Sequence, residues 1–543
     1  MLTRIANGRV IDPAHGRDAV GDVWLDDGRI IAPPPGAVAG ESFDATGSIV
    51  MAGAIDIHSH IAGTNVNIAR LLLPELHRGG AAAPAPTPLS TAAWSTFSTG
   101  CRYAVMGFTT VVEPAVAPHH ALHAHLELAD IPIIDKATLA ILGNDDFLLG
   151  LMRAGESSAI RDYVAWTLTT SRALGVKVIN AGAATAFKFN ARTFSLDDVV
   201  PFYGVTSRAI VKTLQRAVCD LGVPHPLHVH CNNLGIAGNV DTALATIAAA
   251  EGLPLHLAHV QFYGYGTEGP RGFSSAAARL AEAVNATPNV TVDVGQVMFG
   301  QTVTNSADVM RQFNARRQAR PRKSVIIDGD ANGGGIVPYD YRADNFHNAV
   351  QWAVGLELFL LINDPSRVFF TTDHPNGAPF WTYPDIFALL MSRELRAEWM
   401  ERLPAAAVEV TTLPAIRREY SLGDIAMMTR AAPARLLGLG DRGHLAPGAV
   451  ADVAVYAEQP DKAKMFSAAA LVFKNGELVV RDGAVLRYRF GRAFAVSPGH
   501  DRAIDRRMTD YYERRYGVAP EVFAVPDAAI GRPDPIERVP CAS

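Results

Sequence analysis

Two histidines, His58 and His60, form an HxH motif in the segment DIHSH. In a β-strand, side chains two residues apart point to the same face, so both rings would face one side of a sheet. Two imidazoles placed in this way can bind one metal ion. The alternative is a pair of histidines that merely pack at a strand end, so the motif needs support from other segments.

Lys177 lies in the short apolar run GVKVIN and has no evident acidic partner in the sequence. Burial favours the neutral form of a lysine amine. A neutral ε-amine can add CO2 and become a carbamate, whose two oxygens can bridge two divalent ions. From this segment alone, the better supported alternative is a lysine that extends its charged end to solvent.

Three further side chains with metal-binding chemistry close apolar runs: His230 in LHVHCNN, His259 in LHLAHV and Asp373 in FFTTDHP. One imidazole on each of two successive strands predicts ligands for a second ion. His228 shares a face with His230 and is an alternative ligand, but His230 is nearer the strand end. Asp373 taken alone could be a helix N-cap. Six suitable side chains at the ends of five runs are unlikely to gather by chance.

Eight short apolar runs, separated by helical lengths, carry these residues and predict a (β/α)8 barrel. In such a barrel the functional side chains gather at the C-terminal ends of the strands. The runs cover residues 49–60, 107–114, 131–137, 175–180, 225–230, 253–260, 289–297 and 367–375.

The barrel is expected to be framed by β-rich segments from both ends of the chain, which together form one small β-domain. Asp27-Gly28 is a hairpin signal in the first of them. The expected division is 1–50 for the first part of the β-domain, 51–440 for the barrel with insertions at about 61–100 and 298–366, 441–495 for the second part, and 496–543 for a tail that we interpret as a docking segment.

Composition limits the class of protein. The chain has 543 residues, of which 49% are hydrophobic and 19% charged, and a formal net charge of −5, as in a globular protein without a polyanion partner. The basic run 311–323 lacks interleaved aromatics, so nucleic-acid binding is not expected. The start lacks a signal-peptide pattern and no apolar run is long enough to span a membrane, which predicts a cytoplasmic protein.

These motifs resemble those of the amidohydrolase superfamily, namely DIHSH, the strand-four lysine, HVHCNN, the AH of the sixth run and TTDHP. The resemblance implies two divalent ions and a CO2-derived carbamate. Zinc is the first choice because imidazole suits it. The implied site is His58 and His60 for one ion, His230 and His259 for the other, carboxylated Lys177 between them, and Asp373 as ligand and catalytic acid/base.

A closer resemblance is to the family of amidohydrolase-type subunits found in formylmethanofuran dehydrogenases and in the related bacterial formyltransferase/hydrolase complexes. It is carried by HVHCNNLGIAGN, GGGIVPYDYRADNFHNAVQWAVGLE, TTDHPNGAPF and IAMMTRAAPAR. It implies hydrolysis of an N-formyl group on methanofuran or an analogue, a linear formamide, to formate and free amine, with other subunits as partners. His228, Asn232 and Asn233 are expected to contact the substrate.

Three alternatives remain open from the sequence. The first is the formate-condensing member of this family in a formylmethanofuran dehydrogenase, which runs the same reaction in reverse. The second is a cyclic amidase of the hydantoinase or dihydroorotase kind, against which the long insertion 298–366 argues. The third is an inactive amidohydrolase-fold scaffold, although such scaffolds typically lose ligands and every expected position is filled here.

Overall fold

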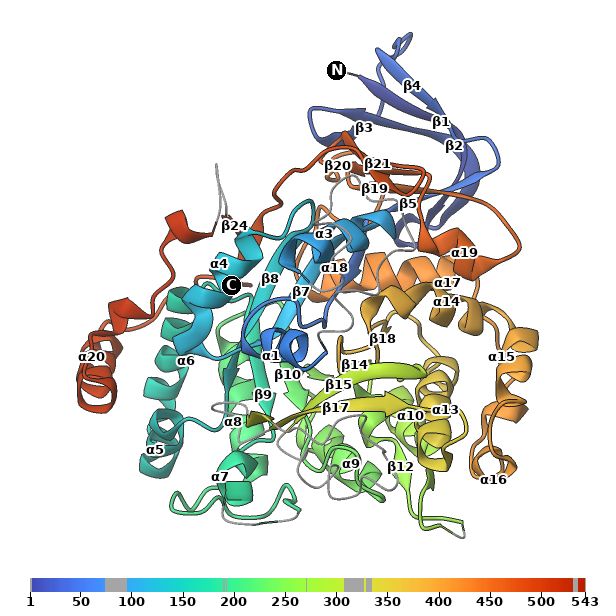
Figure 1. The fold of residues 1–543 in the computed structure, drawn as a ribbon. Coiled ribbons are helices and arrows are strands. Elements are labelled where there is room, and N and C mark those ends of the chain that lie inside the picture. The colour runs from blue at the N-terminus through green and yellow to red at the C-terminus, as the bar shows by residue number, and fades with distance from the viewer. Residues whose placement is uncertain are drawn as a thin grey trace.

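The chain is described from a computed structural model, drawn in Figure 1. The described residues are 2–73, 95–188, 191, 193–269, 271–306, 327–328, 335–530 and 536–542. Most of the first insertion and the basic run 311–323 lie outside these ranges, so the expectations for them remain predictions.

Eight parallel strands form the barrel, each paired with the next along the chain. The ring closes where Ser59 pairs in parallel with His374 and the His60 amide donates to the His374 carbonyl at 2.8 Å. The predicted barrel is thereby confirmed. Its strands are β6 (Ala54–Asp56), β7 (Phe108–Val116), β8 (Asp135–Leu142), β9 (Gly175–Ile179), β10 (Leu227–His230), β11 (Leu255–Leu257), β14 (Val290–Asp293) and β18 (Val368–Phe369).

Two of the predicted runs differ from the strands observed. The run 49–60 contains two strands, β5 (Ser48–Ala52) in the terminal sheet and β6 in the barrel, so it links the two sheets. The third run begins four residues later than expected, at Asp135 instead of Ile131. Residues 131–134 stay outside the strand, since Ile133 has a φ of +70°, which is incompatible with extended backbone. Asp135, which the predicted run includes, is buried in the strand because Lys474 donates to its carboxylate at 2.7 Å.

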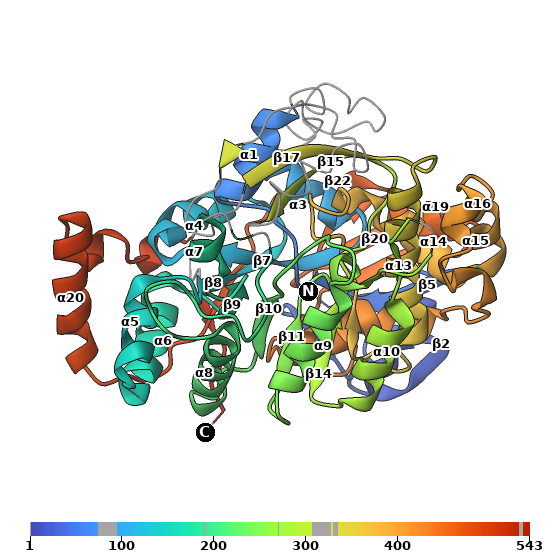
Figure 2. The ribbon, with the colours of Figure 1, turned by 90° about the horizontal axis from the view of Figure 1, so that it is seen from below.

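Helices cover the outside of the barrel strands, as the view in Figure 2 shows. Their sequences fit this position: α8, for example, begins after Thr206, whose hydroxyl accepts from the Ala209 amide, and buries Ile210 and Leu214 on one face. The described helices from α3 to α18, some of which pack on other helices or near the terminal sheet, are α3 (Thr96–Val105), α4 (Ala121–Ala129), α5 (Asp146–Ala154), α6 (Ser157–Ser171), α7 (Ala183–Lys188), α8 (Ser207–Asp220), α9 (Val240–Ala249), α10 (Ala277–Ala286), α13 (Phe346–Leu361), α14 (Tyr383–Met391), α15 (Arg393–Met400), α16 (Ala405–Val408), α17 (Leu422–Ala426) and α18 (Ala432–Leu436).

The two ends of the chain share a second sheet, as predicted. N-terminal β5 pairs antiparallel with C-terminal β19, with Val50 opposite Val455. Buried side chains of this sheet, including Val50 and Val455, form an apolar cluster that is separate from the main core. Its strands are β1 (Thr3–Asp12), β2 (Arg17–Asp26), β3 (Arg29–Ile31), β4 (Glu41–Asp44), β5, β19 (Val453–Ala457), β20 (Leu471–Lys474), β21 (Glu477–Arg481) and β22 (Ala484–Val485), with α19 (Lys462–Ser467) between β19 and β20.

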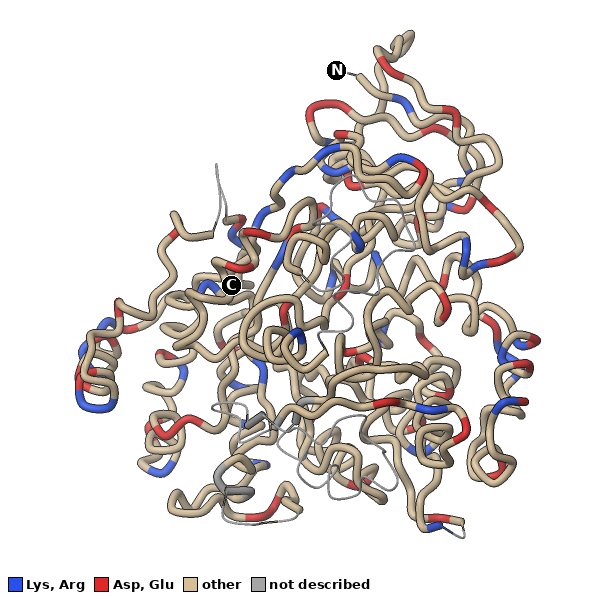
Figure 3. Tube along the Cα trace, in the orientation of Figure 1, with Lys and Arg blue, Asp and Glu red and all other residues tan. Residues whose placement is uncertain are grey.

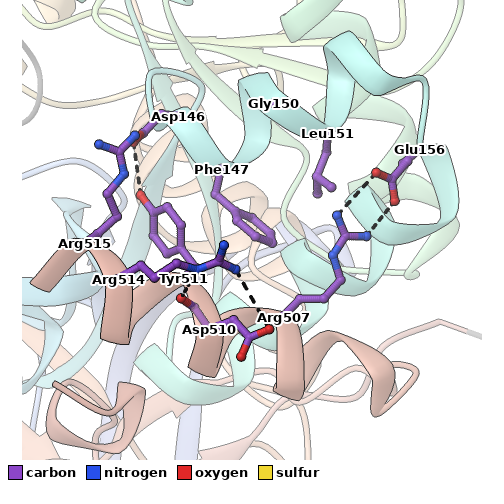
Figure 4. A pocket seen from close by; sticks show the side chains of 10 residues that line it. All are labelled: Asp146, Phe147, Gly150, Leu151, Glu156, Arg507, Asp510, Tyr511, Arg514 and Arg515. Carbon is purple, nitrogen blue, oxygen red and sulfur yellow. Dashed lines mark hydrogen bonds and ion pairs between the residues drawn. The ribbon is translucent and has the colours of Figure 1, made fainter. Parts of the chain in front are cut away.

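The C-terminal tail packs on its own barrel. Strand β23 (Ala493–Ala495) pairs in parallel with β8, and β24 (Ile536–Arg538) pairs in parallel with β23. Helix α20 (Ala503–Tyr516), along which acidic and basic residues both occur, lies beside α5 and α6 (Figures 1 and 3). A surface pocket of about 540 Å³ lies between α5 and α20, bordered by the Arg507–Glu156 ion pair (Figure 4). Docking to another chain remains a prediction.

The second insertion contributes an antiparallel sheet of β15 (Gly300–Ser306), β17 (Gly335–Tyr341) and β16 (Ile327–Asp328). Val303 and Ile336 pack against Ala69 and Leu72 of α1 (Thr64–Leu72), the helix that follows His60. The insertion therefore lies at the C-terminal end of the barrel strands, where the predicted site residues lie. Within the described ranges, none of the helices has the length and apolar character needed to cross a bilayer.

Candidate metal centre

His58 and His60 follow the end of β6, and each ring is oriented by a buried carboxylate. Nδ1 of His60 donates to Glu113 at 2.8 Å, and Nδ1 of His58 donates to Asp293 at 2.9 Å. Glu113 also accepts from the Ile61 amide at 2.7 Å, which holds the loop after β6 in place. Donation through Nδ1 leaves Nε2 of a neutral ring with a free lone pair, which is the form that binds metals.

Asp373 lies between these two Nε2 atoms. Its Oδ1 is 3.2 Å from Nε2 of His58 and 3.3 Å from Nε2 of His60, and the donor atoms of the three residues lie within 4.8 Å of one another. Three electron-pair donors that converge in this way repel each other unless a proton or a cation lies between them. The donor set of two imidazoles and one carboxylate suits a divalent transition metal.

The charges around His60 indicate the same need for a cation. Burial lowers the pKa of His60, but the negative charge of Glu113 and the hydrogen bond to Asp373 outweigh it and raise this pKa to about 9. For Asp373, burial raises the pKa, but the interactions with the surrounding imidazole rings, including the contacts with His58 and His60, outweigh it and hold this pKa well below its usual range. The carboxylate is therefore ionised at neutral pH.

Lys177 extends from β9 towards these groups, with Nζ 3.1 Å from Nε2 of His58. Its side chain is 1% exposed, so it does not reach solvent, which argues against the alternative of a solvent-directed lysine. Burial lowers the pKa of the amine, and the negative charges of Asp373, Asp293 and Glu113 only partly oppose this effect. A lysine with a lowered pKa beside convergent metal-binding groups is suited to carbamate formation.

His230 and His259 lie next to each other, with ring centroids 4.5 Å apart. Nε2 of His230 and Nδ1 of His259 are buried and have no hydrogen-bond partner among the described residues. Burial is the main reason why the pKa of His259 falls to about 3 and that of His230 falls well below its usual range, so both rings are neutral. Buried nitrogens with unused lone pairs are what a second ion would require.

The backbone at His259 has an unusual conformation. Its φ of +35° is in the left-handed region, which is uncommon for residues other than glycine. The amide of His259 donates to Asp293 at 2.6 Å, which fixes this conformation. The conformation also requires a glycine nearby, because a Cβ at Gly295 would lie 2.4 Å from Cβ of His259.

The three residues expected to contact substrate have different surroundings. Nε2 of His228 lies 3.0 Å from Nδ1 of His58, the ring nitrogen that faces away from Asp373 and Lys177. Asn233 uses both amide atoms to hold the backbone of Phe194, at 3.0 and 3.1 Å. Asn232 donates to Ser207 at 3.0 Å, while its oxygen has no partner within the described part of the chain. Their role in substrate binding remains a prediction.

Glu113 and Asp293 are site residues that the sequence interpretation missed. Glu113 is next to last in the predicted run GFTTVVEP, and this position was the available signal. Asp293 lies in the middle of the predicted run NVTVDVGQV and ends a strand only as observed. Asp56, the last residue of β6, is another buried carboxylate that the sequence interpretation did not name. Burial raises its pKa to about 6, although the hydroxyls of Tyr383 and Tyr103 donate to it at 2.5 and 2.8 Å.

Comparison with known proteins assigns the class. Residues 41–486 match the model of the amidohydrolase family, a range that covers the barrel strands β6 to β18 and the part of the terminal sheet that follows β3. The chain belongs to the amidohydrolase family.

Within this family the similarity extends over whole chains. The sequence is 52% identical, over 97% of both chains, to FhcA of the formyltransferase/hydrolase complex Fhc from Methylorubrum extorquens. The crystal structure of that complex (FhcABCD) with methylofuran contains a chain that superposes with a TM-score of 0.95 and full coverage of both chains. Protein FwdA from Methanocaldococcus jannaschii is 36% identical over 96% of both chains.

Proposed function

We propose that this chain is the hydrolytic component of a formyltransferase/hydrolase complex, in which it cleaves the N-formyl group of a methanofuran-type carrier. The products are formate and the free amine of the carrier. The observation that carries the proposal is the 52% identity over 97% of both chains to FhcA, a component of such a complex. The buried groups around His58, His230, Lys177 and Asp373 supply the chemistry that such a hydrolysis needs.

The residues present would suit two divalent ions, for which a carbamate on Lys177 would be a shared ligand. His58 and His60 would hold one ion together with Asp373, towards which their Nε2 atoms face, and His230 and His259 would hold the other through ring nitrogens that have no partner among the described residues. We propose zinc, since imidazole ligands suit it and carboxylates complete its coordination. When bound, such ions polarise an amide carbonyl and make a water molecule acidic near neutral pH.

Asp373 is the proposed proton carrier. Its pKa lies well below neutral, so its carboxylate is ready to accept a proton from the attacking water. Its Oδ1 lies 3.2 and 3.3 Å from Nε2 of His58 and His60, so the carboxylate lies among the proposed ligands of the first ion. The same carboxyl group then donates this proton to the amine nitrogen as the carbon–nitrogen bond breaks. One group thus serves as base in the first step and as acid in the second.

Hydrolysis is proposed over formate condensation because the identity to FhcA of the hydrolase complex, 52%, exceeds the 36% identity to FwdA. Full-length coverage in both comparisons also favours a linear formamide substrate over a cyclic amide. We further propose that the other subunits of the complex are its partners and that it functions in the cytoplasm.

The test is the release of formate by the purified metal-replete protein, together with its co-purifying subunits, from an N-formylated primary amine. Hydantoin and dihydroorotate serve as control substrates. We expect formate from the formamide and no ring opening of the controls. Cleavage of the cyclic amides alone would contradict the proposed substrate. Failure to bind metal in metal-replete medium would support the inactive scaffold instead.

A further inference from the structure

Asp293, at the end of β14, contacts ligands from both halves of the metal centre. Its Oδ2 accepts from Nδ1 of His58 at 2.9 Å and from Nε2 of His256 at 3.0 Å. Its Oδ1 accepts from the backbone amide of His259 at 2.6 Å. The carboxylate is fully buried, with 0% exposure. One side chain thus connects a proposed ligand of the first ion to a proposed ligand of the second.

The two contacts act on different properties of the ligands. At His58, an ionised carboxylate can only accept, so it fixes the hydrogen on Nδ1 and leaves Nε2 as the electron-pair donor towards Lys177 and Asp373. At His259, the contact is with the backbone, and it holds a left-handed conformation that directs the ring towards His230.

His256 holds the carboxylate itself in place. Its Nε2 donates to Asp293, and its Nδ1 lies 2.8 Å from the Thr291 hydroxyl, two residues before Asp293 on the same strand. The ring is 0% exposed. Asp293 therefore has a fixed position in the barrel core. Its carboxylate cannot move closer to His58 and thereby lose its contact with His259, or the reverse.

We propose that Asp293 is a positioning residue shared by both ion sites, so that the two halves of the metal centre form or are lost together. This inference rests on the proposed metal centre. Glu113 offers the natural contrast, because the only imidazole to which it is hydrogen-bonded within the described ranges is that of His60. Its effect is confined to the first ion.

Two substitutions separate the two contacts of Asp293. In Asp293→Asn, the amide oxygen still accepts from His259, whereas the amide nitrogen faces His58 and favours the hydrogen on Nε2, where the metal should bind. In Asp293→Ala, both contacts are lost. Glu113→Gln is the matched variant for His60. Asp145→Asn is the control, because Asp145 is a partly buried carboxylate that caps α5 and is hydrogen-bonded to Leu148 and Tyr163, not to a proposed ligand.

The readout is the affinity for each of two Zn2+ ions, measured by competition with a chelator on the metal-free protein. Cobalt spectra of the same variants report the geometry of each site. We expect Asp293→Asn and Glu113→Gln each to lower the affinity for the first ion by about 10- to 100-fold and the affinity for the second ion by less than about 3-fold. Asp293→Ala should lower the affinity for both ions by at least about 10-fold. Asp145→Asn should match the wild type.

The inference is overturned if Asp293→Ala weakens only one ion, or if it binds both ions as the wild type does. Circular dichroism of each metal-free variant identifies a folding defect. If Asp293→Ala does not fold, Asp293→Leu takes its place, because it also removes both contacts but keeps the branched shape of the side chain, and it should likewise weaken the binding of both ions by at least about 10-fold. A wild-type protein that binds no Zn2+ contradicts the proposed metal centre and not the role of Asp293 alone, so the two failures are distinguishable.

Discussion

Two clusters of buried charged groups lie at opposite ends of the barrel strands, and they differ in how completely their members are paired. At the start of β8, Lys474 donates to Asp135 at 2.7 Å and to Asp452 at 2.6 Å, which joins the barrel to the terminal sheet. At the C-terminal ends of the strands, His230 and His259 keep unpartnered ring nitrogens within the described part of the chain. Burial and charge are common to both clusters. The difference lies in the imidazoles of the second cluster, whose unused ring nitrogens are able to bind a metal ion.

The largest effect is expected for Lys177→Ala. Without the amine no carbamate forms, so the ions lose their bridge and the hydrolysis loses several kcal/mol of stabilisation, which corresponds to about a 1,000-fold or greater loss of formate release. Metal content, measured by mass spectrometry, should fall in parallel.

Added short-chain carboxylic acids provide the control for this variant. They can take the place of the carbamate and should restore part of the activity. Full activity of Lys177→Ala without added acid would contradict the proposed role of Lys177 in the metal centre and would indicate a purely structural role.

The next largest effect is expected for Asp373→Asn. The amide cannot carry the proton from water to the leaving amine, so kcat should fall by about 100-fold or more. The thermal stability of the metal-free protein should not fall, because Asp373 faces other electron-pair donors there. Steady-state kinetics and thermal denaturation test the two statements separately, and an unchanged kcat would exclude Asp373 as the proton carrier.

Lys474→Met tests the paired cluster around Asp135. In contrast to the variants of the metal centre, it should lower stability and leave activity unchanged. It leaves the carboxylates of Asp135 and Asp452 buried without their shared cation, which should lower the free energy of unfolding by about 3–5 kcal/mol. The metal content and kcat of the folded fraction should remain those of the wild type. Urea denaturation measures the first quantity, and an unchanged midpoint would mean that the cluster does not stabilise the fold.

The smallest effect is a pH dependence that arises from Lys136, beside the paired cluster. Burial lowers the pKa of Lys136 to about 8, and its Nζ donates to the Ile131 carbonyl at 3.0 Å. Between pH 8 and the pKa of an unfolded lysine, about 10.4, the unfolded chain binds more protons, so this group makes stability rise with pH over that window. From pH 8 to 10, the unfolding free energy of the wild type should therefore increase relative to that of Lys136→Met, by up to a few kcal/mol. A constant difference would contradict the lowered pKa.

The same contrast explains what could be predicted from sequence. The HxH motif and the polar residues that close apolar strands are local patterns, so the barrel was predictable and the proposed ligands could be named before the structure brought them together. Asp293 contacts residues 34 to 235 positions away, and no spacing in the sequence encodes which strand ends face each other. Likewise, the predicted third run included Asp135, but its buried partner Lys474 lies 339 positions further along the chain and could not be predicted.

The proposed two-metal hydrolysis is tested most directly by titrating metal-free protein with Zn2+ while measuring formate release from an N-formylated primary amine. We predict that activity rises with added metal and reaches a plateau at about two equivalents per chain. Absence of formate at every metal loading, in a sample that binds the ions, would contradict the proposed hydrolysis.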